Sequence, residues 1–185
     1  MANSLTNPAV DPLQLSSYET SSSAIFSSFT ASTAWSLGTA LRARIQSLPA
    51  DQRKPAVISI TQTQGNQVLF QAVTESGTGP DNEEWVRRKR NTVLRWGLST
   101  WALRQKIAAT APTDVEVAFS RKFALKSSNG SGIPDDYAIH GGGFPVRVKG
   151  IDGLAGVIVV SGLKQEHDHQ VIVEAVKEFI EKGGN

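Results

Sequence analysis

The sequence HGGGFPVRV at positions 140–148, followed by GVIVVSGL at positions 156–163, decides how this chain folds. The apolar run at residues 156–161 lacks the alternation of polar and apolar side chains that marks a half-exposed strand. It is therefore predicted to form a strand that is buried on both faces. Residues 144–148 predict a neighbouring strand, and three glycines lead into it, Gly141, Gly142 and Gly143.

Hydrophobic periodicity and turn residues predict the other elements. Helices are expected at residues 31–48, 81–108 and 165–182, and strands at residues 24–29, 56–62 and 67–73. Gln64-Gly65-Asn66 has the composition of a hairpin turn, so the last two strands are expected to pair. The segment at residues 115–125 is compatible with a helix or a strand, and both stay open.

The second predicted helix carries its own start and stop signals. Asp81 and Glu84 have the spacing of a capping pair, in which each side chain reaches the backbone N–H of the other residue. Gly97 is a weak point near the middle of this helix. Pro112 stands just beyond its expected end.

This order of elements predicts the architecture. Hairpin connections make neighbouring strands antiparallel, and the helices must pack on the resulting sheet. The chain is therefore expected to be an α/β protein of the α+β type with a largely antiparallel central sheet. Residues 16–185 are expected to form a single domain. The polar residues 1–15, which include Pro8 and Pro12, are expected to form a flexible N-terminal arm.

The composition excludes several classes of function. The chain has 185 residues and no cysteine, so it has neither disulfides nor thiolate metal sites. Its 19 basic and 17 acidic residues give a net charge of +2, which does not indicate nucleic acid or anionic lipid as a partner. No apolar stretch approaches the ~20 residues of a membrane span, and the N-terminus does not resemble a secretory signal. A cytoplasmic protein, or one that is also nuclear, is expected.

Three stretches in this order resemble one family. They are residues 29–38, residues 85–93, and residues 140–146 continued by residues 156–163 and 168–169. Together they are similar to the GlcG/HbpS-like, or haem-degrading-domain, superfamily, and within it to a subgroup of unknown function with fungal and bacterial members. The resemblance implies a profilin-like three-layer α/β/α sandwich that assembles into homo-oligomers. It also implies haem as a cofactor to consider, since some relatives bind or degrade it, but a fold alone does not confer function.

The glycine run before the strand has two interpretations. It does not match a phosphate-binding loop, because it leads into a strand rather than into a helix. Either the glycines let two backbone segments approach closely, or their N–H groups form a cradle for an anion. The family pattern implies that this segment shares a ligand pocket with the following turn, the residues being Gly141, Gly142, Gly143, Phe144, Ser161 and Gly162.

Three histidines flank these motifs, and imidazole is a common ligand for haem iron and for zinc. His167 and His169 are two positions apart, so on a helix their side chains point in different directions and do not chelate one ion together. His140 is the best single candidate for a metal or haem ligand, and His169 is the next. The alternative is that these histidines lie at the surface or cap a helix.

A basic segment, residues 87–90, lies between Trp85 and Trp96. Basic and aromatic side chains together bind phosphates and bases in nucleic-acid-binding proteins. Four consecutive helical residues point to every side, however, so ion pairs with nearby acids are favoured and nucleic acid is an unlikely partner. The family pattern implies that Arg88 and Lys89 lie near the pocket and bind an anionic group such as a propionate.

No catalytic constellation emerges from the residues, so a function other than catalysis is favoured. Ser161 lies outside any nucleophile elbow. Glu166 and Asp168 could orient an imidazole, but the acidic residues of any polar helix start could do the same. The first hypothesis is a homo-oligomeric protein that binds a small ligand or another protein. The alternatives are a haem- or iron-binding enzyme or sensor, and an adaptor for protein assembly.

Overall fold

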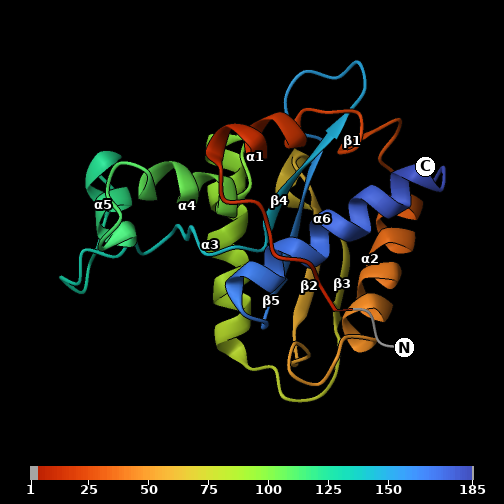
Figure 1. The fold of residues 1–185 in the computed structure, drawn as a ribbon, viewed down its shortest axis with the longest axis horizontal. Helices are drawn as coiled ribbons and strands as arrows, with labels where there is room; N and C mark the ends of the chain where they lie inside the picture. The colour runs from red at the N-terminus through yellow and green to blue at the C-terminus, as the bar shows by residue number, and fades with distance from the viewer. Residues whose placement is uncertain (1–3, 185) are drawn as a thin grey trace.

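A computed structural model describes residues 4–184 as six α-helices and five strands (Figure 1). The helices are α1 Pro12–Glu19, α2 Ala31–Gln46, α3 Pro80–Trp96, α4 Thr100–Ala108, α5 Val115–Lys122 and α6 Gln165–Glu181. The strands are β1 Ile25–Phe26, β2 Val57–Gln62, β3 Val68–Val73, β4 Gly143–Val148 and β5 Gly156–Ser161. None of the helices in this described part of the chain is long and apolar enough to cross a membrane.

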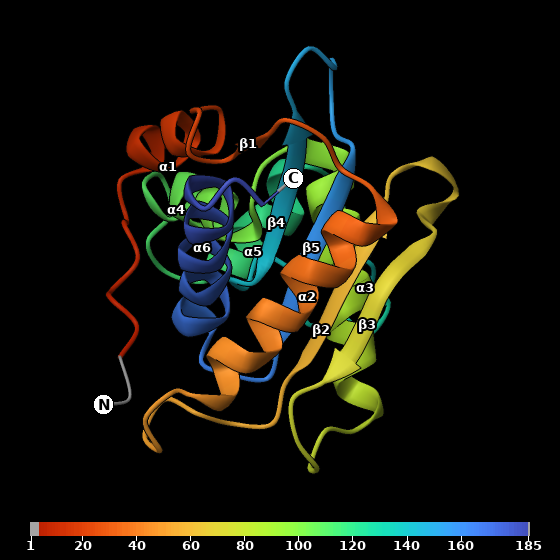
Figure 2. The same ribbon diagram turned by 90° about the vertical axis from the view of Figure 1, so that its right-hand side faces the viewer.

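The strands form one open sheet in the order β1-β4-β5-β2-β3. β1 pairs with β4 in parallel, whereas all other pairs are antiparallel. α2 and α6 cover one face of the sheet, and α3 covers the other, with α4 and α5 on the side of α3 (Figures 1 and 2). The expected three-layer α/β/α sandwich with a largely antiparallel sheet is confirmed.

β5 is the central strand, and every one of its residues is buried. Ile158 and Val160 belong to the apolar cluster under α2 and α6, whereas Val157 and Val159 belong to the cluster under α3. Successive side chains of a strand point to opposite faces, so a strand between two helical layers has no polar face. The unbroken apolar run therefore encodes the middle of the sandwich, as predicted.

The helix predicted over residues 81–108 is two helices, which corrects the expectation from sequence. α3 ends at Trp96, because Gly97 adopts a left-handed conformation with a φ of 65° and its N–H bonds to the carbonyl of Val93. Ser99 then caps α4, since its hydroxyl accepts a hydrogen bond from the N–H of Ala102. Gly97 is thus the end of one helix rather than a weak point inside it.

The predicted capping pair at the start of α3 is also wrong. The helix begins at Pro80, and the Oδ1 of Asn82 accepts the N–H of Gly79 at 2.9 Å. Glu84 instead forms an ion pair with Arg87 on the next turn. The segment left open at residues 115–125 contains the short helix α5.

The first described residues pack against the domain. Leu5 is buried, the hydroxyl of Thr6 donates to Glu174 of α6, and the indole N–H of Trp101 donates to the carbonyl of Ala9. Asp11 then caps α1, which opens with a proline. Residues 4–11 therefore lead along α6 into a helix, and residues 1–3 of the expected arm lie outside the described residues.

A buried ion pair joins the two helical layers. The Nζ of Lys89 in α3 lies 3.0 Å from the Oδ2 of Asp168 in α6, and the two side chains are only 3% and 4% exposed. Lys89 also donates to the carbonyl of Val160 near the end of β5. The pair therefore ties α3, β5 and α6 together at one end of the sheet.

His169, the next residue of α6, is enclosed in the core. Its ring lies against Trp101 and Phe144, with centroid distances of 6.0 and 6.3 Å. Burial lowers the pKa of His169 to about 3, because a charged imidazole would lose its hydration. The side chain is therefore neutral at physiological pH.

Breaking the ion pair from one side should be more damaging than replacing both partners. Asp168→Asn leaves the ammonium of Lys89 buried without a counter-charge, so we expect a loss of about 3–5 kcal/mol in the free energy of unfolding. The double variant Lys89→Met/Asp168→Asn removes that charge and should be at least as stable as Asp168→Asn. Urea unfolding of both single variants and the double variant tests this, and simple additivity of the two losses would contradict it.

Acidification should destabilise the fold in part through His169. The imidazole titrates near 6.5 in the unfolded chain, whereas its pKa in the fold is about 3. Its contribution to stability is therefore present above pH 6.5 and is lost as the pH falls towards 3. Between pH 7 and pH 5 the wild type should lose about 2 kcal/mol more than His169→Leu in urea unfolding. Equal losses of stability in the two proteins would show that the pKa of His169 is not lowered in the folded protein.

Candidate functional site

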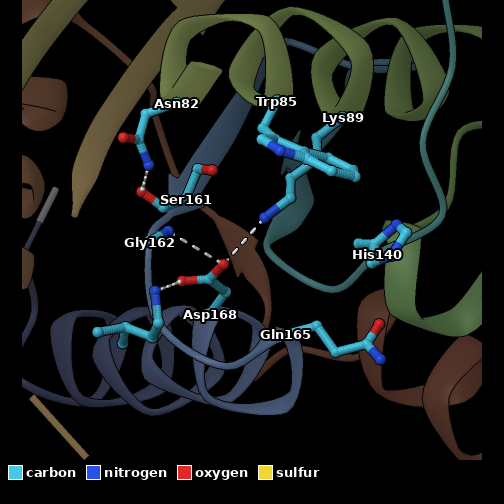
Figure 3. A pocket seen from close by; sticks show the side chains of 9 residues that line it. Asn82, Trp85, Lys89, His140, Ser161, Gly162, Gln165 and Asp168 are labelled. Atoms are coloured by element: carbon cyan, nitrogen blue, oxygen red, sulfur yellow. Dashed lines mark hydrogen bonds and ion pairs between the residues drawn. The ribbon is translucent and has the colours of Figure 1, made fainter. Parts of the chain in front are cut away.

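A cavity of about 270 Å³, here called the first cavity, lies where β5 ends and the chain turns into α6 (Figure 3). α3 lies across it, and the loop before β4 contributes one wall residue. Its lining residues are Asn82, Trp85, Lys89, His140, Ser161, Gly162, Leu163, Gln165 and Asp168. Because α3 and α6 lie on opposite faces of the sheet, they meet only beyond the end of a strand, and the first cavity occupies that meeting point.

The ammonium of Lys89 reaches from α3 into the middle of this wall (Figure 3). Two of its three N–H groups bond to protein, one to the carbonyl of Val160 at 2.9 Å and one to Asp168 at 3.0 Å. The carboxylate of Asp168 also accepts the backbone N–H groups of Gly162 and Leu163. Burial raises the pKa of Asp168 to about 6, and the charge of Lys89 opposes that rise. One N–H of the ammonium remains for a ligand.

Two more polar groups of the wall are open. The hydroxyl of Ser161 makes no hydrogen bond to residues 4–184, although the carbonyl of the same residue accepts the amide of Asn82. The Oε1 of Gln165 is buried and has no hydrogen-bond partner in the described part of the chain. Buried polar atoms are rarely unpaired in folded proteins. Both groups therefore lack a hydrogen-bond partner within residues 4–184.

His140 stands at the side of the first cavity. Its ring meets the ring of Trp85 edge to face at 4.7 Å, and its Nε2 lies 3.4 Å from the carboxylate of Glu116, which also bonds to Arg104. Burial lowers the pKa of His140 to about 4, although Glu116 favours the charged form. The imidazole is therefore neutral at pH 7, and one of its two nitrogens faces Glu116.

A second cavity of about 630 Å³ adjoins the first and shares Trp85 and His140 with it. Arg88 lies in its wall: the guanidinium is stacked over Trp85 at 4.7 Å and donates to the carbonyls of Pro134 and Tyr137. The structure thus places Arg88 and Lys89 in adjoining cavities and not in one anion site.

The glycine run lies behind the first cavity. A Cβ on Gly141 would stand 2.1 Å from the carbonyl oxygen of Gln165, and one on Gly142 would stand 2.3 Å from that of Val160. The same Cβ on Gly142, which has a φ of 111°, would come within 2.8 Å of the Nζ of Lys89. A Cβ on Gly143 would stand 2.8 Å from the Cγ2 of Thr100. The geometry favours close backbone approach over an anion cradle, and Gly142 leaves the space that the ammonium fills.

The first cavity does not fit haem. A haem group needs an axial ligand and a largely apolar slot, whereas the first cavity is small and only about half apolar. His169 is closed off between Trp101 and Phe144, so neither it nor Phe144 lines the first cavity. Within residues 4–184, no three His, Cys, Asp or Glu side chains gather as metal ligands.

The basic segment at residues 87–90 is distributed over different surroundings. Arg87 pairs with Glu84 and Asp136 at the surface, while Arg88 and Lys89 turn inward. The segment therefore presents no continuous basic surface, as the helical spacing predicted.

Sequence reasoning named Lys89, His140, Ser161 and Gly162 as candidates, and the structure brings these four together on one wall. It missed the other wall residues as site residues, namely Asn82, Trp85, Leu163, Gln165 and Asp168. Trp85 and Asp168 were present in the motifs of the family resemblance. Nothing in the sequence signalled that a lysine of one helix would meet an aspartate 79 positions later.

Known proteins resemble this chain along most of its length. A family model described as "Haem degrading protein HbpS-like" matches residues 29–177. The UPF0303 protein SCO2848 of Streptomyces coelicolor is 35% identical over 180 residues, which cover 97% of this chain and 99% of that protein. A UPF0303 protein of Acidobacterium capsulatum is 37% identical over 156 residues, covering 84% and 82% of the two chains.

Solved structures of other proteins also resemble this chain. The crystal structure of the yeast protein Ybr137w has a TM-score of 0.78 at 28% identity and covers 95% of this chain and 91% of that one. The crystal structure of HbpS has a TM-score of 0.55 at 22% identity, covering 82% and 89%, and supports the fold alone. From the matched residues and the relatives together, the chain belongs to the HbpS-like family and, within it, is similar to the UPF0303 proteins.

Proposed function

We propose that this protein binds a small organic acid in the first cavity. The observation that carries the proposal is the buried ammonium of Lys89, which has one N–H left and lines the same cavity as Ser161. A carboxylate accepts hydrogen bonds from an ammonium and a hydroxyl at once, and such charge-assisted bonds are stronger than neutral ones.

The surroundings of Lys89 favour an anion although Asp168 lies beside it. The charge of Asp168 is matched by the ammonium and by two backbone N–H groups. Gln165 is the first residue of α6, so the positive end of the helix dipole faces the first cavity.

The volume limits the size of the ligand. Drug-sized molecules occupy pockets of roughly 300–1,000 Å³. A cavity of about 270 Å³ with polar walls suits an acid of a few carbon atoms rather than a macrocycle. A haem- or iron-dependent activity is therefore less well supported than binding of a small acid.

Calorimetry with matched acids and amides tests the proposal. Lactate and other short carboxylates should bind to the wild type, whereas lactamide should bind at least about tenfold more weakly, because it lacks the charge that Lys89 recognises. Ser161→Ala should weaken lactate binding about tenfold and leave the melting temperature unchanged, since its hydroxyl bonds to no described residue.

Ser59→Ala is the matched control for that variant. Ser59 is buried under α3 on the neighbouring strand, and its hydroxyl also lacks a partner in the described residues, but it does not line the first cavity. It should leave lactate affinity unchanged. Equal binding of lactate and lactamide, or equal weakening by both serine variants, would contradict the proposal.

We also propose that the protein associates with copies of itself, or with a protein partner, through the edge formed by α2 and β3. β3 is an edge strand, and its Val68 and Val73 are about half exposed. Trp35 of α2 is 63% exposed and rests on Phe70 of β3. Exposed apolar residues beside an open strand edge are typical of association surfaces.

Native mass spectrometry tests this second proposal. Trp35→Glu places a charge on the edge and should shift the distribution towards monomers without affecting the fold, because the side chain is mostly in solvent. Leu13→Glu is the control, since Leu13 of α1 is even more exposed but lies away from β3. A wild-type distribution in Trp35→Glu, or the same shift in Leu13→Glu, would show that this edge is not the contact.

A further inference from the structure

We propose that Lys89 is a catalytic nucleophile that forms an imine with a small carbonyl compound in the first cavity. This inference rests on the proposed binding of an organic acid, and it narrows the ligand to the class of short 2-oxo acids. Such a molecule carries the carboxylate that the cavity favours and, next to it, a carbonyl carbon that an amine attacks.

The position of Lys89 suits a nucleophile as well as a positive charge that binds an anion. It is the only lysine of residues 4–184 that is buried, since every other lysine side chain in this part is exposed. Its amine lies on the wall of the first cavity, where a bound carbonyl compound meets it. Gly142 and Val160 fix its position, because no Cβ fits beside the Nζ and the carbonyl holds one N–H.

A proton acceptor stands beside the amine. The Oδ2 of Asp168 is 3.0 Å from the Nζ, so the ammonium can transfer a proton along an existing hydrogen bond. In a buried site the neutral pair of amine and carboxylic acid is closer in energy to the ion pair than it is in water. Asp168 thereby supplies the free amine that attack requires.

The reaction then balances with groups that are present. The amine of Lys89 attacks the carbonyl carbon, a C–N bond forms, and one nitrogen proton moves to the former carbonyl oxygen. The protonated Asp168 returns its proton to that hydroxyl, which leaves as water while the C=N bond forms. The products are one water, an iminium ion on Lys89 and the ionised Asp168, so the positive charge stays beside its counter-ion. Ser161 lines the cavity in which this oxygen leaves.

Reductive trapping tests this step on the full chain. The protein is incubated with sodium pyruvate and sodium cyanoborohydride, digested, and its peptides are analysed by mass spectrometry. Lys89 should gain the mass of pyruvate less one oxygen atom, at least about tenfold faster than the exposed Lys177. Excess lactate, which has no carbonyl, should suppress labelling at Lys89 but not at Lys177.

Lys89→Arg is the matched variant, because it keeps the positive charge but forms no imine under these conditions. It should show no label at position 89 and unchanged labelling elsewhere. Should it fail to fold, the suppression of wild-type labelling by lactate carries the test alone. If lactate binds by calorimetry and Lys89 is labelled no faster than Lys177, the imine inference is overturned and the proposed binding stands. If lactate does not bind either, both fail.

Discussion

The ion pair between Lys89 and Asp168 is the constraint on which the rest of the structure depends. Its partners come from helices on opposite faces of the sheet, so they meet only beyond the end of β5. Both groups are removed from water, so each needs hydrogen-bond partners besides the other: Lys89 has the carbonyl of Val160, and Asp168 has two backbone N–H groups. This requirement determines the conformation of the surrounding backbone. Gly142 must lack a side chain, and the turn after β5 must direct two N–H groups at the carboxylate.

The sequence was sufficient to predict the layers because they depend on local patterns. The unbroken apolar run of β5 predicted a strand between two helical layers, and the periodicity of α2 and α6 predicted helices with one buried face. The predicted helix boundaries were wrong where the conformation of a single residue changes the direction of the chain. Gly97 was treated as a weak helix residue, but in the left-handed conformation it ends α3 and lets the chain turn into α4.

The site was predictable only in part, for a different physical reason. Lys89, His140, Ser161 and Gly162 belong to motifs that can be read along the chain, whereas their grouping depends on contacts between distant segments. Arg88 shows the limit: it directly precedes Lys89 on α3, yet the helical rotation between neighbouring residues points it into the second cavity. The glycine run was compatible with close backbone approach or with a ligand cradle, and the role of Gly142, making room for Lys89, involves a residue that lies 53 positions earlier in the chain.

An energetic argument connects the ion pair to the cavity. Two apolar side chains of similar volume would hold α3 against α6 at least as firmly as a buried ion pair, whose desolvation offsets much of its attraction. Stability alone therefore does not account for a lysine and an aspartate at this point. A ligand in the first cavity would give this polarity a further role, because the ammonium both borders the cavity and retains an unused N–H. The name of the family refers to haem, whereas the charged group that borders this cavity is a buried amine.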